Sequence, residues 1–484
     1  MTTPLSDLIQ SRLDKLAKLE QLGIVTSAYG YDKTHSVVAC LASLDKEVKT
    51  AGRIMALRSH GKLTFADLVD ETGKIQIFFN EAELDETTYE IVRLLDLGDF
   101  IGVTGQVFTT KAGETTIKAV KLDFLSKSLH PLPDTWYGLK DKEERFRRRY
   151  VDLLMNPPAK LLLDKRFAIV KAVREFLWSQ NYTEVETPIL QSLYGGTNAR
   201  PFTTHLNALD IDMYLRVAPE LYLKRLIVGG YERIFEIAKN FRNEGMDLIH
   251  QPEFSMMEFY EAYADYYRIM ALTEALIKDV AVKVNGTTIL QVGDHEVNLA
   301  GDWRKITINE ALLEYEKIDA LTITDAAIQE ILVKEKLKIP GVFTRNKALF
   351  IIFDHLVTDK LIQPTWVIDY PKEVSPLSKI HRTDPEKVER FEGYIGGKEI
   401  CDGWTEIVSP LEQRDRFETE QKNLKSGDAE AMPLDEEFLE ALSYGCPPLG
   451  GIGIGIDRLV MFLTNTWSIR EVIAFPLMRP ENNP

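Results

Sequence analysis

The chain has 484 residues, of which 45% are hydrophobic and 27% charged, and its formal net charge is −16. This is the composition of a soluble globular protein with about three domains, and it excludes a disordered, collagen-like or membrane-embedded chain. The acidic total also excludes a polycation that coats nucleic acid, so a nucleic-acid partner would need local basic patches. Three widely spaced cysteines, and an N-terminus without a basic start and an apolar core, favour the reducing cytoplasm.

The first segment, 1–45, is expected to be a helical extension. Apolar residues recur at three- and four-residue spacings from Leu5 to Leu22, which is typical of an amphipathic helix, and Gly23 ends it. We expect this helix to pack on the domain that follows rather than to act as a targeting signal.

The next segment, 46–130, is rich in β-forming residues. Five short runs separated by turns predict strands at 48–55, 65–69, 74–79, 100–108 and 115–125, with a helix near 81–95. This order suits an OB-fold barrel, which binds oligonucleotides on a strand face. The pattern alone would fit any small β-barrel.

Residues 131–160 are expected to link the barrel to a larger domain. The linker follows the stiff segment His130-Pro-Leu-Pro133, and its run from Lys140 to Tyr150 carries four arginines and interleaved aromatic residues. Such a run is typical either of a solvated helix face or of a contact with phosphates. Its position between a barrel and a large domain favours the phosphate contact.

The remaining residues, 161–484, mix helices and strands without a βαβ rhythm. Their patterns predict helices at 161–181, 262–284, 325–338 and 431–444, and a strand at 182–188 that Pro188 ends. We therefore expect an α+β domain in which a mostly antiparallel sheet carries the functional site, with a helical insertion near 310–360.

The densest group of functional residue types lies in the segment 236–260. Gly245 and Pro252 mark a loop between two strands, and Arg242 and Glu244 share parity on the first strand. An arginine there could fork onto a carboxylate or a phosphate. On the second strand, four side chains alternate onto one face that could stack a ring and clamp a cation: Phe254, Met256, Glu258 and Tyr260. Taken alone, the pattern favours an ordinary amphipathic hairpin.

A second group lies in the segment 394–406. Asp402, Trp404 and Glu406 have the same parity, whereas Glu399 has the opposite one. Glu399 can reach their face only if a β-bulge falls between residues 399 and 402. Glu399 and Glu406 would then offer hard oxygen ligands to a Mg²⁺ ion that carries substrate phosphates, although unaided carboxylates at this spacing are more often surface charges.

A third group, 447–461, is rich in glycine. It is not a Walker loop, because no Gly-Lys-Ser/Thr follows the glycines, and it lacks the strand–helix frame of a dinucleotide site. Its glycines alternate with isoleucines, which predicts a strand with one bare face where a flat ligand could approach closely. Close packing against a neighbouring element would explain the glycines equally well, but not Arg458 at the start of an apolar helix.

Together, these groups resemble the three signature motifs of class II aminoacyl-tRNA synthetases, in the right order. Motif 1 is similar to 182–190, motif 2 to 241–258 and motif 3 to 451–458, and the barrel at 46–126 is similar to the N-terminal anticodon-binding domain of subclass b. Within that subclass the lysyl-tRNA synthetases are most similar, on the segments Gly195-Gly196, 199–202, 214–225, 240–245, 252–254, 256–260 and 363–365. The resemblance extends from about residue 50 to Pro480.

The resemblance implies that ATP binds in a bent form over the sheet. Arg242 would hold the α-phosphate and the substrate carboxylate, and Phe254 and Arg458 would sandwich the adenine, with Arg458 also near the γ-phosphate. Glu244 would accept a hydrogen bond from the adenine amino group, and His250 would lie near the outer phosphates. Arg242 and Arg458 would be the catalytic residues, since catalysis here is positioning and charge neutralisation without a protein nucleophile.

The resemblance also implies metal, amino-acid and tRNA sites. Up to three Mg²⁺ ions per site would be held by Glu399 and Glu406. Lysine would bind among Gly196, Glu220, Arg242, Glu258, Tyr260, Asp402, Trp404 and Glu406. Anticodon bases of tRNA(Lys) would meet Phe65 and Gln76, with Arg58 and Glu114 as weaker candidates. A homodimer formed through motif 1, in the cytoplasm, is expected.

The sequence departs from the family at several positions. Asp402 and Trp404 replace an asparagine and a phenylalanine or tyrosine, Ile407-Val-Ser409 replaces Leu-Asn-Asp, and Ile249 replaces a common arginine. Compensated drift within a lysine enzyme would explain these changes. The alternatives are a pocket retuned to ornithine or β-lysine, and a non-catalytic tRNA-binding regulator. The last is disfavoured because Arg242, Glu399, Glu406 and Arg458 are all retained.

Overall fold

The computed structural model describes residues 5–133, 139, 141–339, 343–426 and 430–481. Its contacts divide the chain into two compact units, Met1–Lys140 and Asp141–Pro484, which are described separately. The ends of the expected extension and of the expected catalytic domain, and part of the expected linker, lie outside the described residues. No helix in the described ranges is long and apolar enough to cross a membrane.

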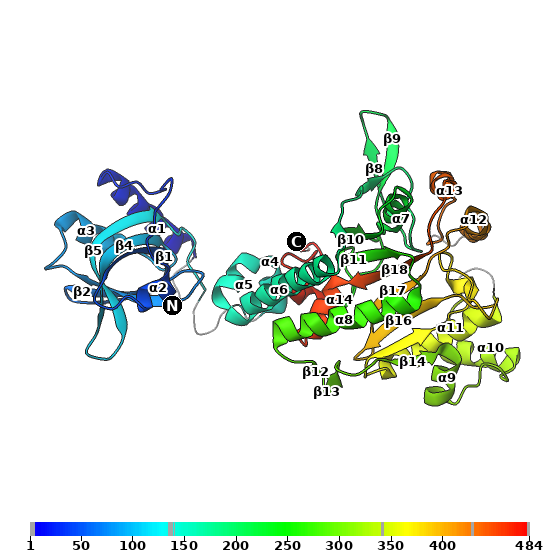
Figure 1. The fold of residues 1–484 in the computed structure, drawn as a ribbon. Helices are drawn as coiled ribbons and strands as arrows, with labels where there is room; N and C mark the ends of the chain where they lie inside the picture. The colour runs from blue at the N-terminus through cyan, green and yellow to red at the C-terminus, as the bar shows by residue number, and fades with distance from the viewer. Residues whose placement is uncertain (1–4, 134–138, 140, 340–342, 427–429, 482–484) are drawn as a thin grey trace. The chain divides into compact units, whose positions relative to one another are not determined.

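The N-terminal unit is a closed barrel with strand order β1-β2-β3-β5-β4 (Figure 1). Its strands are β1 Glu47–His60, β2 Leu63–Val69, β3 Lys74–Asn80, β4 Phe100–Thr109 and β5 Thr115–Ser126, and its helices are α1 Leu5–Gln21, α2 Val37–Leu41 and α3 Glu86–Leu94. Alternate side chains of each strand fill the interior, as Ile75, Ile77 and Phe79 of β3 do. The predicted helix, five strands and inserted helix are confirmed.

The C-terminal unit is built on an eight-stranded sheet with strand order β14-β15-β16-β17-β18-β11-β10-β6. Its strands are β6 Thr183–Glu184, β10 Arg233–Phe241, β11 Glu253–Ala262, β14 Arg304–Thr307, β15 Thr365–Ile368, β16 Arg390–Ile395, β17 Lys398–Thr405 and β18 Leu449–Gly455. The pairs β14–β15 and β10–β6 are parallel and the other pairs are antiparallel. The mostly antiparallel sheet predicted from the sequence is confirmed.

Three helices cover one face of this sheet, α6 Pro157–Ser179, α8 Tyr266–Asn285 and α14 Ile456–Leu463 (Figure 1). Their apolar side chains form one core with Met257 and Phe259 of β11. Asp265 caps α8 by accepting hydrogen bonds from two backbone N–H groups of its first turn, a contribution of about 1 kcal/mol. Because the helices occupy this face, the opposite face of the sheet is left for a ligand.

The other helices flank the sheet or lie beyond it. They are α4 Lys142–Arg147, α5 Arg149–Met155, α7 Glu220–Val228, α9 Ile308–Glu316, α10 Asp325–Lys334, α11 Arg345–Leu356, α12 Pro410–Lys425, α13 Glu436–Ser443 and α15 Ile469–Val472, with short 3₁₀ turns at Thr358–Lys360 and Lys372–Val374. Helices α9, α10 and α11 share a separate apolar core in the region where the sequence predicts a helical insertion.

Two small sheets complete the unit. One contains β7 Leu190–Gln191, β8 Phe202–Leu206 and β9 Ile211–Leu215, and the other contains β12 Ile289–Val292 and β13 His295–Asn298. The hairpin β8–β9 projects from the unit (Figure 1). The strand predicted at 182–188 is much shorter than expected, because β6 lies at the edge of the large sheet and pairs with β10 only at residues 183 and 184.

Candidate active site

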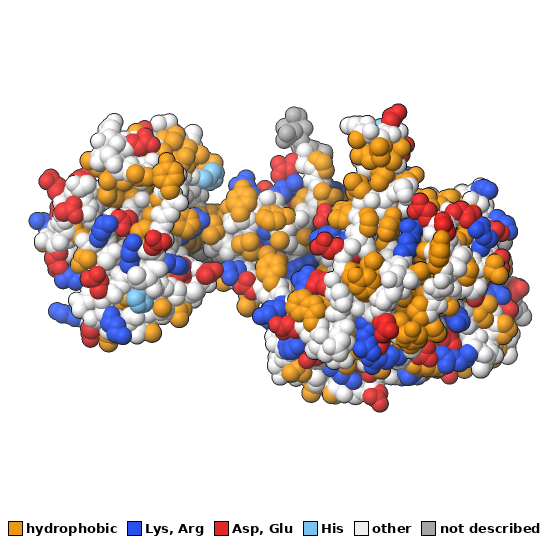
Figure 2. All heavy atoms as spheres, turned by 45° about the horizontal axis from the view of Figure 1, so that its top comes forward, with side chains coloured by type: hydrophobic (Ala, Val, Ile, Leu, Met, Phe, Trp, Pro, Cys, Tyr) orange, Lys and Arg blue, Asp and Glu red, His pale blue; other side chains and the backbone are white. Residues whose placement is uncertain are grey.

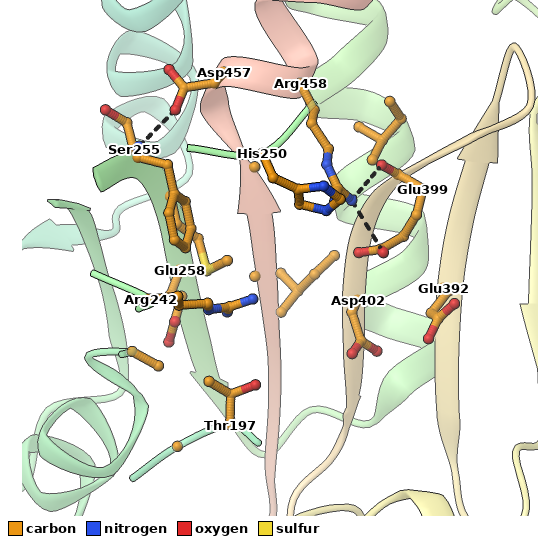
Figure 3. A pocket seen from close by; sticks show the side chains of 18 of the residues that line it. Thr197, Arg242, His250, Ser255, Glu258, Glu392, Glu399, Asp402, Asp457 and Arg458 are labelled. Atoms are coloured by element: carbon orange, nitrogen blue, oxygen red, sulfur yellow. Dashed lines mark hydrogen bonds and ion pairs between the residues drawn. The ribbon is translucent and has the colours of Figure 1, made fainter. Parts of the chain in front are cut away.

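A pocket of about 290 Å³ opens on the helix-free face of the sheet (Figure 3). It is bounded by β11, β16, β17 and β18, by the loop after β10, and by the first turns of α7 and α14. The predicted residues that line it are Gly196, Glu220, Arg242, Glu244, His250, Phe254, Glu258, Tyr260, Glu399, Asp402, Trp404 and Arg458. Residues from the three sequence groups therefore meet in one cavity.

Strand β11 presents the alternation that the sequence predicts. Phe254, Met256, Glu258 and Tyr260 all line the pocket. The Tyr260 hydroxyl donates a hydrogen bond to Glu258 Oε2 at 2.9 Å. Burial, together with the charge of Glu220, raises the pKa of the Glu258 carboxyl well above its usual range. A cation that entered here would find a buried carboxylate already oriented by a phenol.

Arg242 lies in the loop after β10 rather than on the strand, which ends at Phe241, so the predicted shared strand parity with Glu244 is wrong. The loop is held by hydrogen bonds from the Arg242 N–H to the Pro252 carbonyl at 2.9 Å and from the Asn243 N–H to the Arg200 carbonyl at 2.8 Å. The Arg242 guanidinium lies 5.0 Å from the Phe254 ring centroid. Its Nε is buried and has no hydrogen-bond partner among the described residues.

The predicted β-bulge is confirmed. Across β16 and β17, Gly393 is opposite Cys401 but Tyr394 is opposite Glu399, so Ile400 is the extra residue. The bulge turns Glu399 into the pocket that Asp402 also lines. There Arg458 donates a hydrogen bond to Glu399 Oε2 at 3.1 Å, and Arg458 Nη2 lies 3.3 Å from His250 Nε2 (Figure 3).

Glu406, which the sequence places with Glu399 at one metal, lies elsewhere. It does not line the pocket. Its side chain is 1% exposed and forms an ion pair with Lys224. The Trp404 Nε1–H also donates a hydrogen bond to Glu406, at 2.7 Å. Glu406 therefore lies outside the cavity that Glu399 lines, and the structure does not place the two expected metal ligands in one cavity.

Glu392 is a pocket residue that the sequence analysis missed. It lines the cavity with Glu399 and Asp402, and Figure 3 shows its carboxylate beside that of Asp402 on the neighbouring strand. Arg390 contacts both, with two hydrogen bonds to Asp402 at 2.9 and 2.8 Å and one to Glu392 at 2.7 Å. Burial raises the pKa of Glu392 to about 8, although Arg390 opposes this shift.

A sequence signal for Glu392 exists. Gly396 and Gly397 both have positive φ, as a two-residue hairpin turn requires, and they fix the register of β16 against β17. With the bulge allowed for, that register places Glu392 opposite Asp402. No cluster of three or more metal-ligating side chains occurs in the described ranges, so protein ligands alone do not complete a cation site here.

The glycines of β18 serve both purposes considered from the sequence, close packing against a neighbouring element and a bare face toward a ligand. A Cβ at Gly451 would overlap the Tyr260 ring and come within 2.5 Å of Glu406 Oε1, so this glycine permits close packing. Gly453 and Gly455 line the pocket and leave its floor bare. Arg458 follows on the first turn of α14 and reaches into the same space.

The outer face of the barrel carries the four residues expected to meet anticodon bases. Phe65 lies between Arg58 and Phe78 in the strand register, and Gln76 lies opposite Asp67. The Phe65 and Phe78 ring centroids are 5.0 Å apart, and Phe108 continues the aromatic row. Two hydrogen bonds fix this face: Gln76 Nε2 donates to Glu114 at 2.9 Å, and Arg58 donates to Asp67 at 2.8 Å. Phe78 and Phe108 were not predicted.

The arginine run before the large domain is neutralised. Each of its four arginines contacts a carboxylate: Arg145 and Arg149 contact Asp152, Arg147 contacts Glu143, and Arg148 contacts Glu144. Three of the four side chains are also largely buried, with only Arg148 more than 20% exposed. The run is therefore neither the solvated helix face nor the free phosphate contact that the sequence left open, but is paired within the large unit.

Comparison with known proteins follows the same division of the chain. Residues 141–479 match the family described as tRNA synthetases class II (D, K and N), and residues 48–125 match the OB-fold nucleic acid binding domain. The chain is 47% identical to a lysine–tRNA ligase of Thermoanaerobacter sp. (strain X514) over 490 residues, which cover 100% of this chain and 98% of the relative. It is 46% identical to the lysine–tRNA ligase of Clostridium acetobutylicum, over 99% of this chain and 95% of that relative.

Proposed function

Because the chain belongs to the lysine–tRNA ligase family of the class II tRNA synthetases, we propose that it activates lysine with ATP and transfers it to the 3′ end of tRNA(Lys) in the cytoplasm. This proposal is supported by the similarity to lysine–tRNA ligases over nearly the full length of the chain. It is also supported by the pocket, which contains several buried carboxylates and Arg242, whose Nε has no hydrogen-bond partner among the described residues. ATP and lysine both carry anionic groups, and lysine also carries two ammonium groups.

The chemistry needs no protein nucleophile. The lysine carboxylate attacks the α-phosphorus of ATP, pyrophosphate leaves, and a ribose hydroxyl of tRNA then takes the lysyl group from the adenylate. The residues accelerate this reaction by placing the two reactants and by neutralising charge as it develops. Arg242 is suited to this role because its guanidinium has no carboxylate in contact among the described residues and faces the cavity.

Four further residues support ATP binding. Phe254 presents its ring to the pocket, and Glu244 also lines it. Arg458 lies 3.3 Å from His250, where the outer phosphates would be placed, and its guanidinium would also cover the adenine opposite Phe254. Arg458 is paired with Glu399, at 3.1 Å. We propose that phosphate takes over the Arg458 guanidinium and leaves the Glu399 carboxylate available.

Two carboxylates of the pocket fit a Mg²⁺ ion that accompanies ATP. Glu392 and Glu399 are carboxylates on neighbouring strands that line one cavity. Mg²⁺ usually binds through one or two carboxylates, with substrate phosphates and water completing its shell. The ion would supply neutralisation of the phosphate charge. We propose Glu392 and Glu399 as its protein ligands.

Lysine fits the remaining part of the pocket. Gly196 has a positive φ and lies against Glu220, where the α-ammonium would bind. Glu258 with its Tyr260 hydrogen bond would meet the distal ammonium. Asp402 does not add a free charge at this end, because Arg390 holds it by two hydrogen bonds. This neutralisation favours lysine over the alternative of a pocket retuned to ornithine or β-lysine.

The barrel face would bind the anticodon. Phe65, Phe78 and Phe108 form a half-buried aromatic row on which bases can stack, and Gln76 and Glu114 offer hydrogen-bonding groups beside it. Stacking of a base on such a ring contributes about 1–3 kcal/mol.

The large unit is proposed to form a homodimer. Large apolar side chains are exposed on α6, with Phe167 57% and Trp178 51% exposed, and in the motif 1 segment, with Leu190 48% exposed. Apolar side chains also gather on the projecting β8–β9 hairpin, where Leu209 is 66% exposed (Figure 2). Exposed apolar patches of this kind mark protein–protein interfaces.

The test of this function is amino-acid-dependent ATP–pyrophosphate exchange on the purified protein, without tRNA. Lysine, β-lysine, ornithine and arginine form the panel. Strong exchange with lysine alone, followed by lysylation of tRNA(Lys), is the expected result. Exchange with another amine would point to a retuned pocket, and no exchange together with tRNA binding would point to a non-catalytic regulator.

A further inference from the structure

A buried lysine of the protein lies behind the proposed lysine pocket. Lys224 is on α7, one turn after Glu220, and its side chain is 1% exposed. Its Nζ contacts Glu220 Oε1 at 2.5 Å and also contacts Glu406 Oε2. Lys224 does not line the cavity, whereas Glu220 does. Glu406 lies just outside the lining, beside Gly451 and the Tyr260 ring, so Lys224 can act on a ligand only through these two carboxylates.

Glu406 is held by one oxygen only. Its Oε2 accepts hydrogen bonds from both the Lys224 ammonium and the Trp404 indole N–H. Its Oε1 is buried and has no hydrogen-bond partner among the described residues. Glu406 Oε1 and the Tyr260 ring both lie against the same side of Gly451. The oxygen is therefore close to the Tyr260 side chain, whose hydroxyl is hydrogen-bonded to Glu258. A buried carboxylate oxygen without a partner is unfavourable, and a cation that reached it would remove that cost.

The charges at this end match a substrate with two ammonium groups. With substrate bound, the carboxylates of Glu220, Glu258 and Glu406 and the single ammonium of Lys224 leave two negative charges. The α-ammonium and the distal ammonium of lysine balance them, while the substrate carboxylate is left to Arg242.

We propose that Lys224 and Trp404 are specificity-determining positioning residues: they fix Glu406 so that its free oxygen stands at one distance from the α-ammonium site. This proposal rests on the proposed lysine activation. Lys224 contacts the carboxylates of both ammonium sites and ties their positions together. The Trp404 indole N–H adds a second fixed donor to Glu406 that a phenylalanine could not supply. An amine one methylene shorter would then fall short of Glu406.

The test is Trp404→Phe, which keeps an aromatic ring and removes the N–H donor. Exchange kinetics with lysine and with ornithine, and calorimetric titration of lysine without ATP, are measured on the full chain. We expect KM and Kd for lysine to rise about tenfold, kcat to change less than about threefold, and the preference for lysine over ornithine to fall about tenfold.

Trp366→Phe is the matched control. Trp366 is fully buried, and its indole N–H donates to Glu274 at 2.7 Å, away from the pocket lining. This change removes the same kind of hydrogen bond, so the melting temperature should fall while KM and the lysine preference stay unchanged.

Lys224→Met supplies a second variant, since it removes the other donor to the same oxygen. It should also raise KM for lysine and lower the preference over ornithine. The proposal is overturned if Trp404→Phe, or Lys224→Met should the first variant not fold, changes stability alone as Trp366→Phe does. Absence of lysine-dependent exchange in the unaltered protein would instead reject the proposed function.

Discussion

The barrel face and the catalytic pocket present opposite kinds of binding surface. On the barrel, half-buried rings lie in a row and the nearby polar groups are already paired with one another, as Gln76 is with Glu114. In the pocket, charged groups are buried and some have no partner, as at Arg242 Nε and Glu406 Oε1. The difference fits the proposed roles, in which tRNA stacks its bases on a fixed surface, whereas small charged substrates supply counter-charges in the pocket.

The largest effect is expected from removal of the Arg242 guanidinium, whose Nε has no hydrogen-bond partner among the described residues. Arg242→Ala should reduce lysine-dependent pyrophosphate exchange by about 1,000-fold or more, because the other two arginines of the pocket, Arg390 and Arg458, are already paired with carboxylates. Binding of tRNA to the barrel should persist, as a filter-binding assay would show. Near-normal exchange in this variant would reject the site.

The next effect tests the exchangeable ion pair. Glu399→Gln removes the partner of Arg458 and one proposed Mg²⁺ ligand, so exchange should fall about 100-fold and need more Mg²⁺ for half-maximal rate. Direct Mn²⁺ binding in the presence of ATP, followed by electron paramagnetic resonance, should weaken as well. Asp359→Asn is the matched control, because Asp359 pairs with Lys398 at the surface and such pairs contribute less than about 1 kcal/mol. Equal losses in both variants would contradict the assignment.

The barrel side of the comparison predicts a smaller and separable effect. Phe65→Ala should raise KM for tRNA about tenfold in aminoacylation and leave pyrophosphate exchange unchanged. Phe100→Ala serves as control, since Phe100 is a partly exposed barrel phenylalanine that contacts Arg53 instead of the aromatic row. If Phe65→Ala lowered both activities equally, the ring would support folding and not tRNA binding.

The smallest expected effect is the release of protons when lysine binds. Burial, with the charge of Glu220, raises the pKa of Glu406 to about 8 even beside Lys224. The stability that this raised pKa contributes is present below about pH 4.3 and is lost as the pH rises through 8. An ammonium ligand favours the ionised forms of Glu406 and Glu258, so lysine binding should release protons near pH 7 and be a few-fold tighter at pH 8.5 than at 6.5.

Calorimetric titration with lysine alone, in buffers of different ionisation enthalpy, counts these protons without involving the ATP end. The variant Glu406→Gln should bind lysine weakly and release about one proton fewer than the unaltered protein. Proton release that was unchanged in the variant would assign the effect to another group.

Much of this pocket was predictable because local patterns fix it. The two-residue period of β11 placed Phe254 and Glu258 on one face, and the parity of Glu399 required the bulge that Ile400 supplies. Contacts between segments far apart in the chain were not predictable. Nothing near Glu406 in the sequence indicates that Lys224 lies against it, and the Phe78 contact with Phe65 depends on the barrel register.

The glycine strand β18 has a consequence for substrate size. It is hydrogen-bonded to β11 on one side and to β17 on the other, and it runs from Gly451 beside Glu406 to Gly455 near Arg458. The span between the proposed amine site and the proposed phosphate site is therefore built from backbone that is tethered along both edges. Side chains at either end can rotate, but that span cannot lengthen or shorten, so a molecule of the wrong length finds no compensating movement.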